Sequence, residues 1–248
     1  TAKVLCPDKK VLVPDMEAGC SLADSCPADK FAQFVHAHPD HTVISYVNTT
    51  AAVKAVTDVV VTSTNARQIV ESLPKDEKII FGPDKNLGGY INRETGRNML
   101  LWNGSCHVHE QFSVEKLVET KAQHPDALIL AHPECKQAIQ EMADVVGSTA
   151  ALLKFAVIHP DRKYIVVTES GILHEMQKKC PNTTFIPALP ENDSCACNEC
   201  SYMRLNTLQK LYDCLKNESP EIVVDKEIAE KAVHPIERML EISEKLGL

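Results

Sequence analysis

The stretch His38-Pro-Asp-His-Thr-Val-Ile-Ser-Tyr-Val-Asn48 returns 86 residues later as His124-Pro-Asp-Ala-Leu-Ile-Leu-Ala-His-Pro-Glu134. Each copy consists of a polar turn, an apolar run and a polar end. Short runs of Val, Ile and Leu that are bounded by Pro and Asp are typical of buried strands. The same offset pairs Ser63 with Thr149. The sequence therefore indicates two copies of one folding unit.

The rest of each copy follows the same order of strands and helices. Three further pairs of segments correspond: an Ala-rich helical stretch at about 51–56 and 135–142, a strand at 78–81 and 164–168, and a strand at 98–102 and 184–188. Strands that alternate with amphipathic helices favour short parallel sheets with helices on both faces. The predicted fold class is therefore α/β, built from repeated three-layer α/β/α domains.

The last part of the chain, from about residue 206, is predicted to be helical. Leucines recur at helical spacing over 205–215, and 226–248 forms a second amphipathic run. Pro235 lies inside that run. It predicts a break after His234, because proline lacks a backbone N–H and disfavours helical backbone at the residue before it.

The composition excludes several classes of protein. The 248 residues suffice for one large domain or two to three small ones, with 44% apolar and 24% charged residues. A net charge of −8 without a basic run excludes an electrostatic surface for nucleic acid. The sequence has no 18-residue apolar stretch and no signal-peptide pattern, so it predicts no membrane span. We expect a cytoplasmic protein whose ten cysteines are metal ligands or buried thiols rather than disulfides.

Cysteines stand at repeating positions in the chain. Cys20 and Cys106 are one repeat apart, and the triplet Cys195-Ala-Cys197-Asn-Glu-Cys200 falls where a third matching position is expected. If the repeats fold alike around a common axis, three distant thiolates meet at one metal site. The triplet alone leaves a small zinc loop or a redox dithiol open. The remaining cysteines are predicted to be packing residues: Cys6, Cys26, Cys135, Cys180 and Cys214.

Ionisable side chains follow the predicted strands, at the strand ends where parallel α/β folds place their functional groups. His132 and Glu134 follow the strand 128–130. An imidazole and a carboxylate two residues apart can act as acid and base or can hold a substrate. His109 is also predicted to lie at a strand end, on the same face as Cys106.

Hydroxyl groups occupy similar positions. Tyr46 ends its strand, and Ser63 follows the strand 59–61. Ser148 and Thr149 come after a glycine and directly before a predicted helix. At such a helix start, hydroxyls and amides either bind an anion or simply cap the helix.

Six polar segments distinguish the chain: Pro14-Asp-Met-Glu-Ala-Gly-Cys20-Ser-Leu-Ala-Asp, Tyr46-Val-Asn48-Thr-Thr-Ala, Thr62-Ser63-Thr-Asn-Ala, Trp102-Asn-Gly-Ser-Cys106-His-Val-His109, His132-Pro-Glu134-Cys and Gly147-Ser-Thr149. Together they resemble the quinolinate synthase family, the iron–sulfur enzymes of NAD biosynthesis. The resemblance covers nearly the whole chain. It implies three α/β domains related by a pseudo-threefold axis around a central active site.

The resemblance implies a transferase that condenses iminoaspartate (iminosuccinate) with dihydroxyacetone phosphate to quinolinate, phosphate and water. L-aspartate oxidase is the implied supplier of iminoaspartate. The family's 4Fe–4S cluster maps onto Cys20, Cys106 and Cys200. Three protein ligands leave one iron open, and an open iron can act as a Lewis acid that binds a substrate oxygen and assists dehydration.

The resemblance also assigns residues to the active site. The implied substrate-binding residues are Tyr46, Val47, Asn48, Ser63, His132, Pro133, Glu134, Ser148 and Thr149. The implied catalytic residues are Tyr46, His109, His132 and Glu134. Glu134 and His132 are expected to move protons and orient the substrate, Tyr46 to donate or accept a proton, and Ser63 and Thr149 to bind carboxylate or phosphate.

The resemblance divides the chain into parts. We expect 1–20 to be the end of a first domain that is mostly missing from this sequence, 21–106 and 107–200 to be the second and third α/β domains, and 201–248 to be helices that return to the first domain. Family members often carry Cys-x-x-Cys-x-x-Cys in the last loop. Here the first spacing is one residue, which argues against a redox role for Cys195 and Cys197.

Two other functions compete with the synthase. One is a non-catalytic α/β fragment or regulatory protein in which the cysteine triplet binds zinc. The other is an iron–sulfur hydro-lyase with a different substrate. The metal content separates the first alternative from the synthase, and the product of the reaction separates the second.

Overall fold

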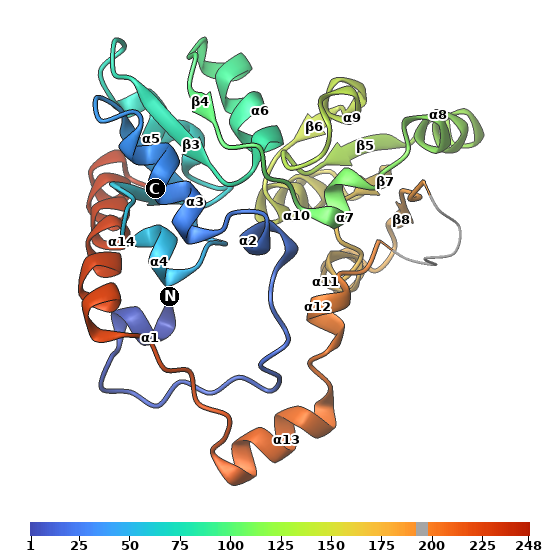
Figure 1. The fold of residues 1–248 in the computed structure, drawn as a ribbon. Coiled ribbons are helices and arrows are strands. Elements are labelled where there is room, and N and C mark those ends of the chain that lie inside the picture. The colour runs from blue at the N-terminus through green and yellow to red at the C-terminus, as the bar shows by residue number, and fades with distance from the viewer. Residues whose placement is uncertain (192–197) are drawn as a thin grey trace. The chain divides into compact units, whose positions relative to one another are not determined.

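The computed structural model of the chain describes residues 1–191 and 198–248. It divides into two compact units (Figure 1). Unit 1 comprises Thr1–Gly104 together with Ser201–Leu248, and unit 2 comprises Ser105–Cys200. The domain boundaries expected at residues 20, 106 and 200 stay predictions.

Unit 1 contains a four-stranded sheet in the order β2-β1-β3-β4. All neighbouring strands are parallel. The strands are β1 (Thr42–Tyr46), β2 (Val59–Val61), β3 (Ile79–Gly82) and β4 (Leu100–Leu101). Every residue of β2 and β3 is buried, as expected for parallel strands that are covered on both faces.

Unit 2 contains a second parallel sheet with the same topology, β6-β5-β7-β8. Its strands are β5 (Leu128–Ala131), β6 (Val145–Val146), β7 (Lys163–Val167) and β8 (Thr184–Pro187). The predicted α/β fold class with repeated parallel sheets is confirmed. The offset of 86 holds for the first two strands of each sheet and shortens to 85 in the third, because Ile79 pairs with β1 where Tyr164 pairs with β5.

Both units also contain helices. Those of unit 1 are α1 (Ala2–Leu5), α2 (Ser21–Asp24), α3 (Ala28–His36), α4 (Ala51–Lys54), α5 (Ala66–Ser72), α6 (Lys85–Thr95), α12 (Ser201–Arg204), α13 (Leu208–Asn217) and α14 (Lys226–Leu246). Those of unit 2 are α7 (His107–Glu110), α8 (Val114–Gln123), α9 (Gln137–Met142), α10 (Thr149–Ile158) and α11 (Ile172–Lys179). No helix in the described ranges is long and apolar enough to cross a membrane.

The two units repeat individual hydrogen bonds as well as elements. The carboxylate of Asp58 accepts a bond of 2.7 Å from the backbone N–H of Val43, and the carboxylate of Asp144 accepts one of 2.7 Å from Ile129. Both pairs are related by the offset of 86. In each unit the aspartate carboxylate satisfies a backbone N–H near the start of the first strand of the sheet, β1 or β5.

Apolar side chains pack on both faces of each sheet. In unit 1, Phe31 and Val53 pack with Val43 and Ile80 beneath the ring of Trp102. The Trp102 ring meets Phe31 edge to face at 5.5 Å, and its indole N–H donates to the carbonyl of Ser25. In unit 2, the corresponding cluster consists of Phe112, Leu117, Ala127, Ile129, Ala131, Cys135, Ile139, Ile165, Val167 and Ala188.

Helix α14 corrects one expectation from the sequence. The break predicted at His234-Pro235 is wrong, because α14 continues from Lys226 through Pro235 to Leu246. The helix lies against β2 and α4 (Figure 1). Its residues Ala232 and Ile236 are buried with Val60 of β2. Burial of this apolar face offsets the roughly 3 kcal/mol that a proline costs inside a helix.

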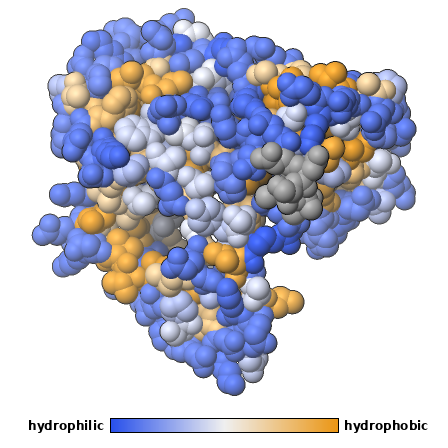
Figure 2. Space-filling view, turned by 45° about the vertical axis from the view of Figure 1, so that its right-hand side comes forward, coloured by the Kyte–Doolittle hydropathy of each residue, from blue (hydrophilic) through white to orange (hydrophobic). Residues whose placement is uncertain are grey.

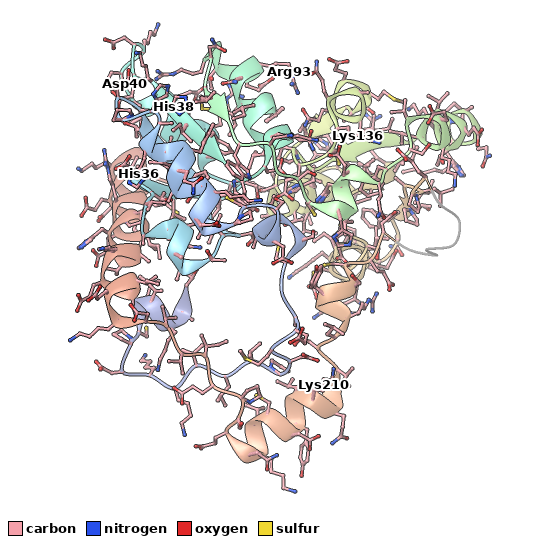
Figure 3. The ribbon with its side chains drawn as sticks, in the orientation of Figure 1. His36, His38, Asp40, Arg93, Lys136 and Lys210 are labelled. Carbon is pink, nitrogen blue, oxygen red and sulfur yellow. The ribbon has the colours of Figure 1, made fainter. Side chains whose placement is uncertain are left out.

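Helix α13 is tied to the N-terminal segment of unit 1 by charge. The ammonium of Lys210 (Figure 3) pairs with the carboxylate of Asp15, and Lys10 pairs with Glu218 after the end of the helix. Apolar side chains remain exposed on this part of the unit (Figure 2), among them Leu208 and Leu215.

A close backbone contact at Gly104 gives a first testable prediction. A Cβ atom at this position would lie 2.4 Å from Oγ of Ser25 and 2.6 Å from the carbonyl oxygen of Pro83. Gly104→Ala therefore forces the backbone apart, and we expect it to lower the free energy of unfolding by about 1–3 kcal/mol in a denaturant titration. Gly89→Ala is the control, because its Cβ would meet only the far end of Arg93 at 3.5 Å. Inside helix α6 that change should stabilise the protein slightly. Equal denaturant concentrations at the unfolding midpoints of Gly104→Ala and Gly89→Ala would contradict the prediction.

Candidate functional site

The three cysteines that were predicted as metal ligands share one local setting. Cys20 is the N-cap of α2, Cys106 is the N-cap of α7, and Cys200 directly precedes α12. Each of these helices has four residues. All three cysteines are half-buried. Cys20 belongs to unit 1, and Cys106 and Cys200 belong to unit 2.

Four of the five cysteines that were predicted to pack differ from these three in their burial. Cys26, Cys135, Cys180 and Cys214 are buried, whereas Cys6 is half-buried. Burial raises the pKa of the Cys26 thiol to about 12, so this side chain stays protonated and inert. Cys195 and Cys197 lie outside the described residues.

A buried polar cluster lies at the carboxyl end of the unit 2 sheet. It consists of His109, His132, Glu134 and Thr168, each less than 10% exposed. Glu134 and His132 come from the loop after β5, His109 comes from α7, and Thr168 follows β7. His132 and Glu134 follow β5, as the sequence predicted. The strand-end position predicted for His109 is wrong, because His109 lies in α7. The structure brings these three side chains into direct contact.

Distances within this cluster define its geometry. Nδ1 of His109 lies 3.1 Å from Oε2 of Glu134, and Nε2 of His109 lies 3.0 Å from the hydroxyl of Thr168. The rings of His109 and His132 stack with their centroids 4.7 Å apart. The distance of 3.1 Å is that of an ion pair, although Nδ1 of His109 has no partner with good hydrogen-bond geometry among residues 1–191 and 198–248. The ion pair with Glu134 therefore only partly meets the hydrogen-bonding capacity of this buried nitrogen.

The pKa values of the two histidines are shifted in opposite directions. Burial alone would lower the pKa of His109, but hydrogen bonds and charge interactions with Cys106 and Glu134 outweigh it and raise this pKa to about 10. Burial, together with the positive charge of His109, lowers the pKa of His132 to about 4. Nδ1 of His132 accepts a bond of 3.3 Å from the backbone N–H of Glu134, as a neutral imidazole can. The cluster thus holds a charged proton donor beside a neutral imidazole.

Three donors in this cluster also have the spacing of a metal site. The sulfur of Cys106, a nitrogen of His109 and an oxygen of Glu134 all lie within 4.8 Å of one another. A protonated His109 cannot ligate a metal through the nitrogen that faces Glu134. In this arrangement the ion pair between His109 and Glu134 therefore competes with metal binding.

In unit 1, the corresponding loop carries Tyr46, Val47 and Asn48. Tyr46 is the last residue of β1 and is buried, Val47 is half-buried and Asn48 is exposed. The hydroxyl of Thr49 donates to the Tyr46 carbonyl at 3.0 Å. Ser63 is half-buried in the turn after β2. These four predicted substrate-binding residues therefore lie at or just after the ends of two neighbouring strands of the same sheet.

The predicted helix start at Ser148 and Thr149 is present. Ser148 is the buried N-cap of α10, and its hydroxyl accepts a bond of 3.2 Å from the backbone N–H of Ala151. Thr149 is the first residue of the helix and is exposed. Pro133 is buried between His132 and Glu134. Their roles in binding stay predictions.

Comparisons with known proteins identify the family. The model of the family described as "Quinolinate synthetase A protein" matches residues 1–241. The chain is 55% identical over 243 residues to the quinolinate synthase of Chloroherpeton thalassium, covering 98% of this chain and 76% of that protein. The chain belongs to this family. The quinolinate synthase of Synechocystis sp. is 56% identical to it over 243 residues, again covering 98% of this chain and 76% of the relative.

Within this quinolinate synthetase A chain, the sequence did not reveal Thr168 as part of the cluster. The available signal was its place directly after β7, because functional groups of parallel sheets follow the strands. Lys54 and Gln140 were also missed. Each lies within a short helix and has no neighbouring motif in the sequence, and only hydrogen bonds in the folded chain show what these side chains do.

Proposed function

We propose that the protein is a quinolinate synthase, a transferase that condenses iminoaspartate with dihydroxyacetone phosphate to quinolinate, phosphate and water. Membership of the quinolinate synthetase A family supports this proposal. The observation that carries it structurally is the buried Glu134 carboxylate beside two imidazoles of opposite protonation preference. Condensation and dehydration need a group that takes up protons and one that gives them at neighbouring positions.

The proposed roles follow from the contacts. Charged His109 stands 3.1 Å from Glu134 and can donate a proton to a substrate oxygen that leaves as water. Neutral His132, 4.0 Å from Glu134, can accept one. Burial of all three side chains keeps water away, so their charges act strongly on a bound substrate. Tyr46, at the end of β1, supplies a hydroxyl group that can donate or accept a proton.

The remaining predicted substrate contacts are proposed to bind and orient. Val47 and Asn48 extend the loop after β1, and Pro133 extends the loop after β5. Ser63, Ser148 and Thr149 carry hydroxyl groups near the ends of β2 and β6, where backbone amides and hydroxyls favour anionic groups. The carboxylates and the phosphate of the proposed substrates are such groups.

We propose that Cys20, Cys106 and Cys200 hold a 4Fe–4S cluster. Their setting fits thiolate ligands, because all three precede short helices and stay half-buried, whereas the packing cysteines Cys26 and Cys180 are buried. When bound, such a cluster supplies an iron atom that polarises a substrate oxygen as a Lewis acid. His109 and Glu134 then remain available for proton transfer.

The direct test is product formation by the full-length protein purified without oxygen. With iminoaspartate generated in the assay and dihydroxyacetone phosphate added, we expect quinolinate and phosphate to form in equal amounts. Omitting dihydroxyacetone phosphate should stop both. A colourless zinc protein that makes no quinolinate would favour the zinc-binding alternative. Dehydration of another hydroxy acid without quinolinate would favour the hydro-lyase.

Supply of iminoaspartate by L-aspartate oxidase and a cytoplasmic location stay predictions.

A further inference from the structure

The loops that carry the predicted site residues are held by side chains at one repeated position. Lys54 of α4 donates from Nζ to the carbonyl oxygens of Val47 at 2.8 Å and Thr49 at 2.7 Å. A third bond, of 3.0 Å, goes to the hydroxyl of Thr49. This hydroxyl in turn donates to the carbonyl of Tyr46. The whole turn from Tyr46 to Thr49 is therefore fixed to α4.

Unit 2 repeats this arrangement with a different side chain. Gln140 of α9 donates from Nε2 to the carbonyl oxygens of Pro133 at 2.8 Å and Cys135 at 2.6 Å. Gln140 follows Lys54 by the repeat offset of 86, and Pro133 and Cys135 follow Val47 and Thr49 by the same offset. The two sheets thus hold their first loops in the same way.

The residue between the two held carbonyls is a site residue in each loop. It is Asn48 in unit 1 and Glu134 in unit 2. We infer that Lys54 and Gln140 are matched positioning residues that set the backbone from which Asn48 and Glu134 reach the substrate. The inference rests on the proposed function, because it assumes that these two side chains contact the substrates.

Burial makes these bonds consequential. Lys54 is 2% exposed and Gln140 is 6% exposed, so both donors lie in the protein interior, and removing either one leaves two carbonyls without these bonds. Among the described residues, the hydrogen bonds of Lys54 all go to neutral oxygens. Burial lowers the pKa of Lys54 to about 8, which shows that the protein holds this amine there at a cost in desolvation. A neutral donor, such as Gln140 in unit 2, would hold the loop with a smaller desolvation penalty.

The repeat itself supplies the variants that test the inference. Lys54→Gln installs the donor that unit 2 uses at the same position, whereas Lys54→Met removes every donor. We expect kcat/KM for quinolinate formation to fall about 10²-fold in Lys54→Met and less than threefold in Lys54→Gln, because an ångström of misplacement costs about that much. Lys30→Met, an exposed change on α3, is the control and should match the unchanged protein.

Gln140→Glu makes the same test in unit 2. The carboxylate keeps the shape of the amide but cannot donate to the Pro133 and Cys135 carbonyls, so we again expect a loss of about 10²-fold. Gln137→Glu is the matched control, because Gln137 lies exposed on the same helix and donates a hydrogen bond to Glu141 on the surface. In both Lys54→Met and Gln140→Glu, the backbone amides of the held loop should exchange hydrogen at least tenfold faster than in the controls.

Two results would overturn the inference. One is unchanged kcat/KM and unchanged loop exchange in Lys54→Met and Gln140→Glu. The other is a loss in Lys54→Gln as large as in Lys54→Met, which would assign the effect to the charge of Lys54 rather than to its hydrogen bonds. Loop exchange is measured without substrate. If the protein without substitutions made no quinolinate, the proposed function would be contradicted. The effect of Lys54 and Gln140 on the loops could still be measured by hydrogen exchange.

Discussion

Replacing Cys106 with alanine in the full-length protein is expected to remove the iron of the proposed 4Fe–4S cluster and to abolish quinolinate formation. Cys106 is the half-buried N-cap residue of α7, and its sulfur lies within 4.8 Å of ligand atoms of His109 and Glu134. A cluster that has three cysteine ligands is expected to be lost when one of these ligands is removed. Iron content and the broad visible absorption of the protein purified without oxygen measure the loss directly.

Cys20→Ala and Cys200→Ala should have the same effect, because these residues occupy the equivalent place before α2 and α12. Cys180→Ala is the matched control. Cys180 is a buried packing residue, so its removal should lower stability without lowering iron content. A protein that keeps its iron and its activity after any one of the three ligand changes would refute the proposed ligand set.

The second large effect is expected from Glu134→Gln, which should lower kcat by about 10²–10⁴-fold. The substitution keeps the shape of the side chain but removes the charge that faces Nδ1 of His109 at 3.1 Å. The buried imidazolium then loses its carboxylate partner, which makes the charged form of His109 less stable. One substitution therefore removes the charge of Glu134 and also makes His109 a less effective proton donor in the proposed mechanism.

Steady-state kinetics over a range of both substrates would measure this effect, and iron content would show that the cluster is retained. Glu141→Gln is the control, because Glu141 is exposed on α9 and contacts Gln137. Activity within tenfold of the unchanged protein would exclude Glu134 from the proposed proton transfer. A loss of iron in Glu134→Gln but not in Glu141→Gln would instead make Glu134 a metal ligand.

The sequence predicted the architecture well because the fold repeats. A buried parallel strand requires a run of apolar residues, and that requirement is visible without coordinates, as at 42–46 and 128–131. The same reasoning placed Tyr46, His132 and Glu134 at strand ends. It failed at Pro235, because a local rule about proline does not include the burial of Ala232 and Ile236 against β2.

The sequence by itself determined a duplicated parallel α/β unit, the strand ends where polar residues gather, and the repeated cysteine position. Only the tertiary structure decided that His109 faces Glu134, that Thr168 bonds to a histidine 59 residues away, and that Lys54 and Gln140 hold equivalent loops. The physical reason is that periodicity and turn chemistry are local properties of the chain. Contacts between distant side chains depend instead on how helices pack against the sheets, which no short stretch of sequence specifies.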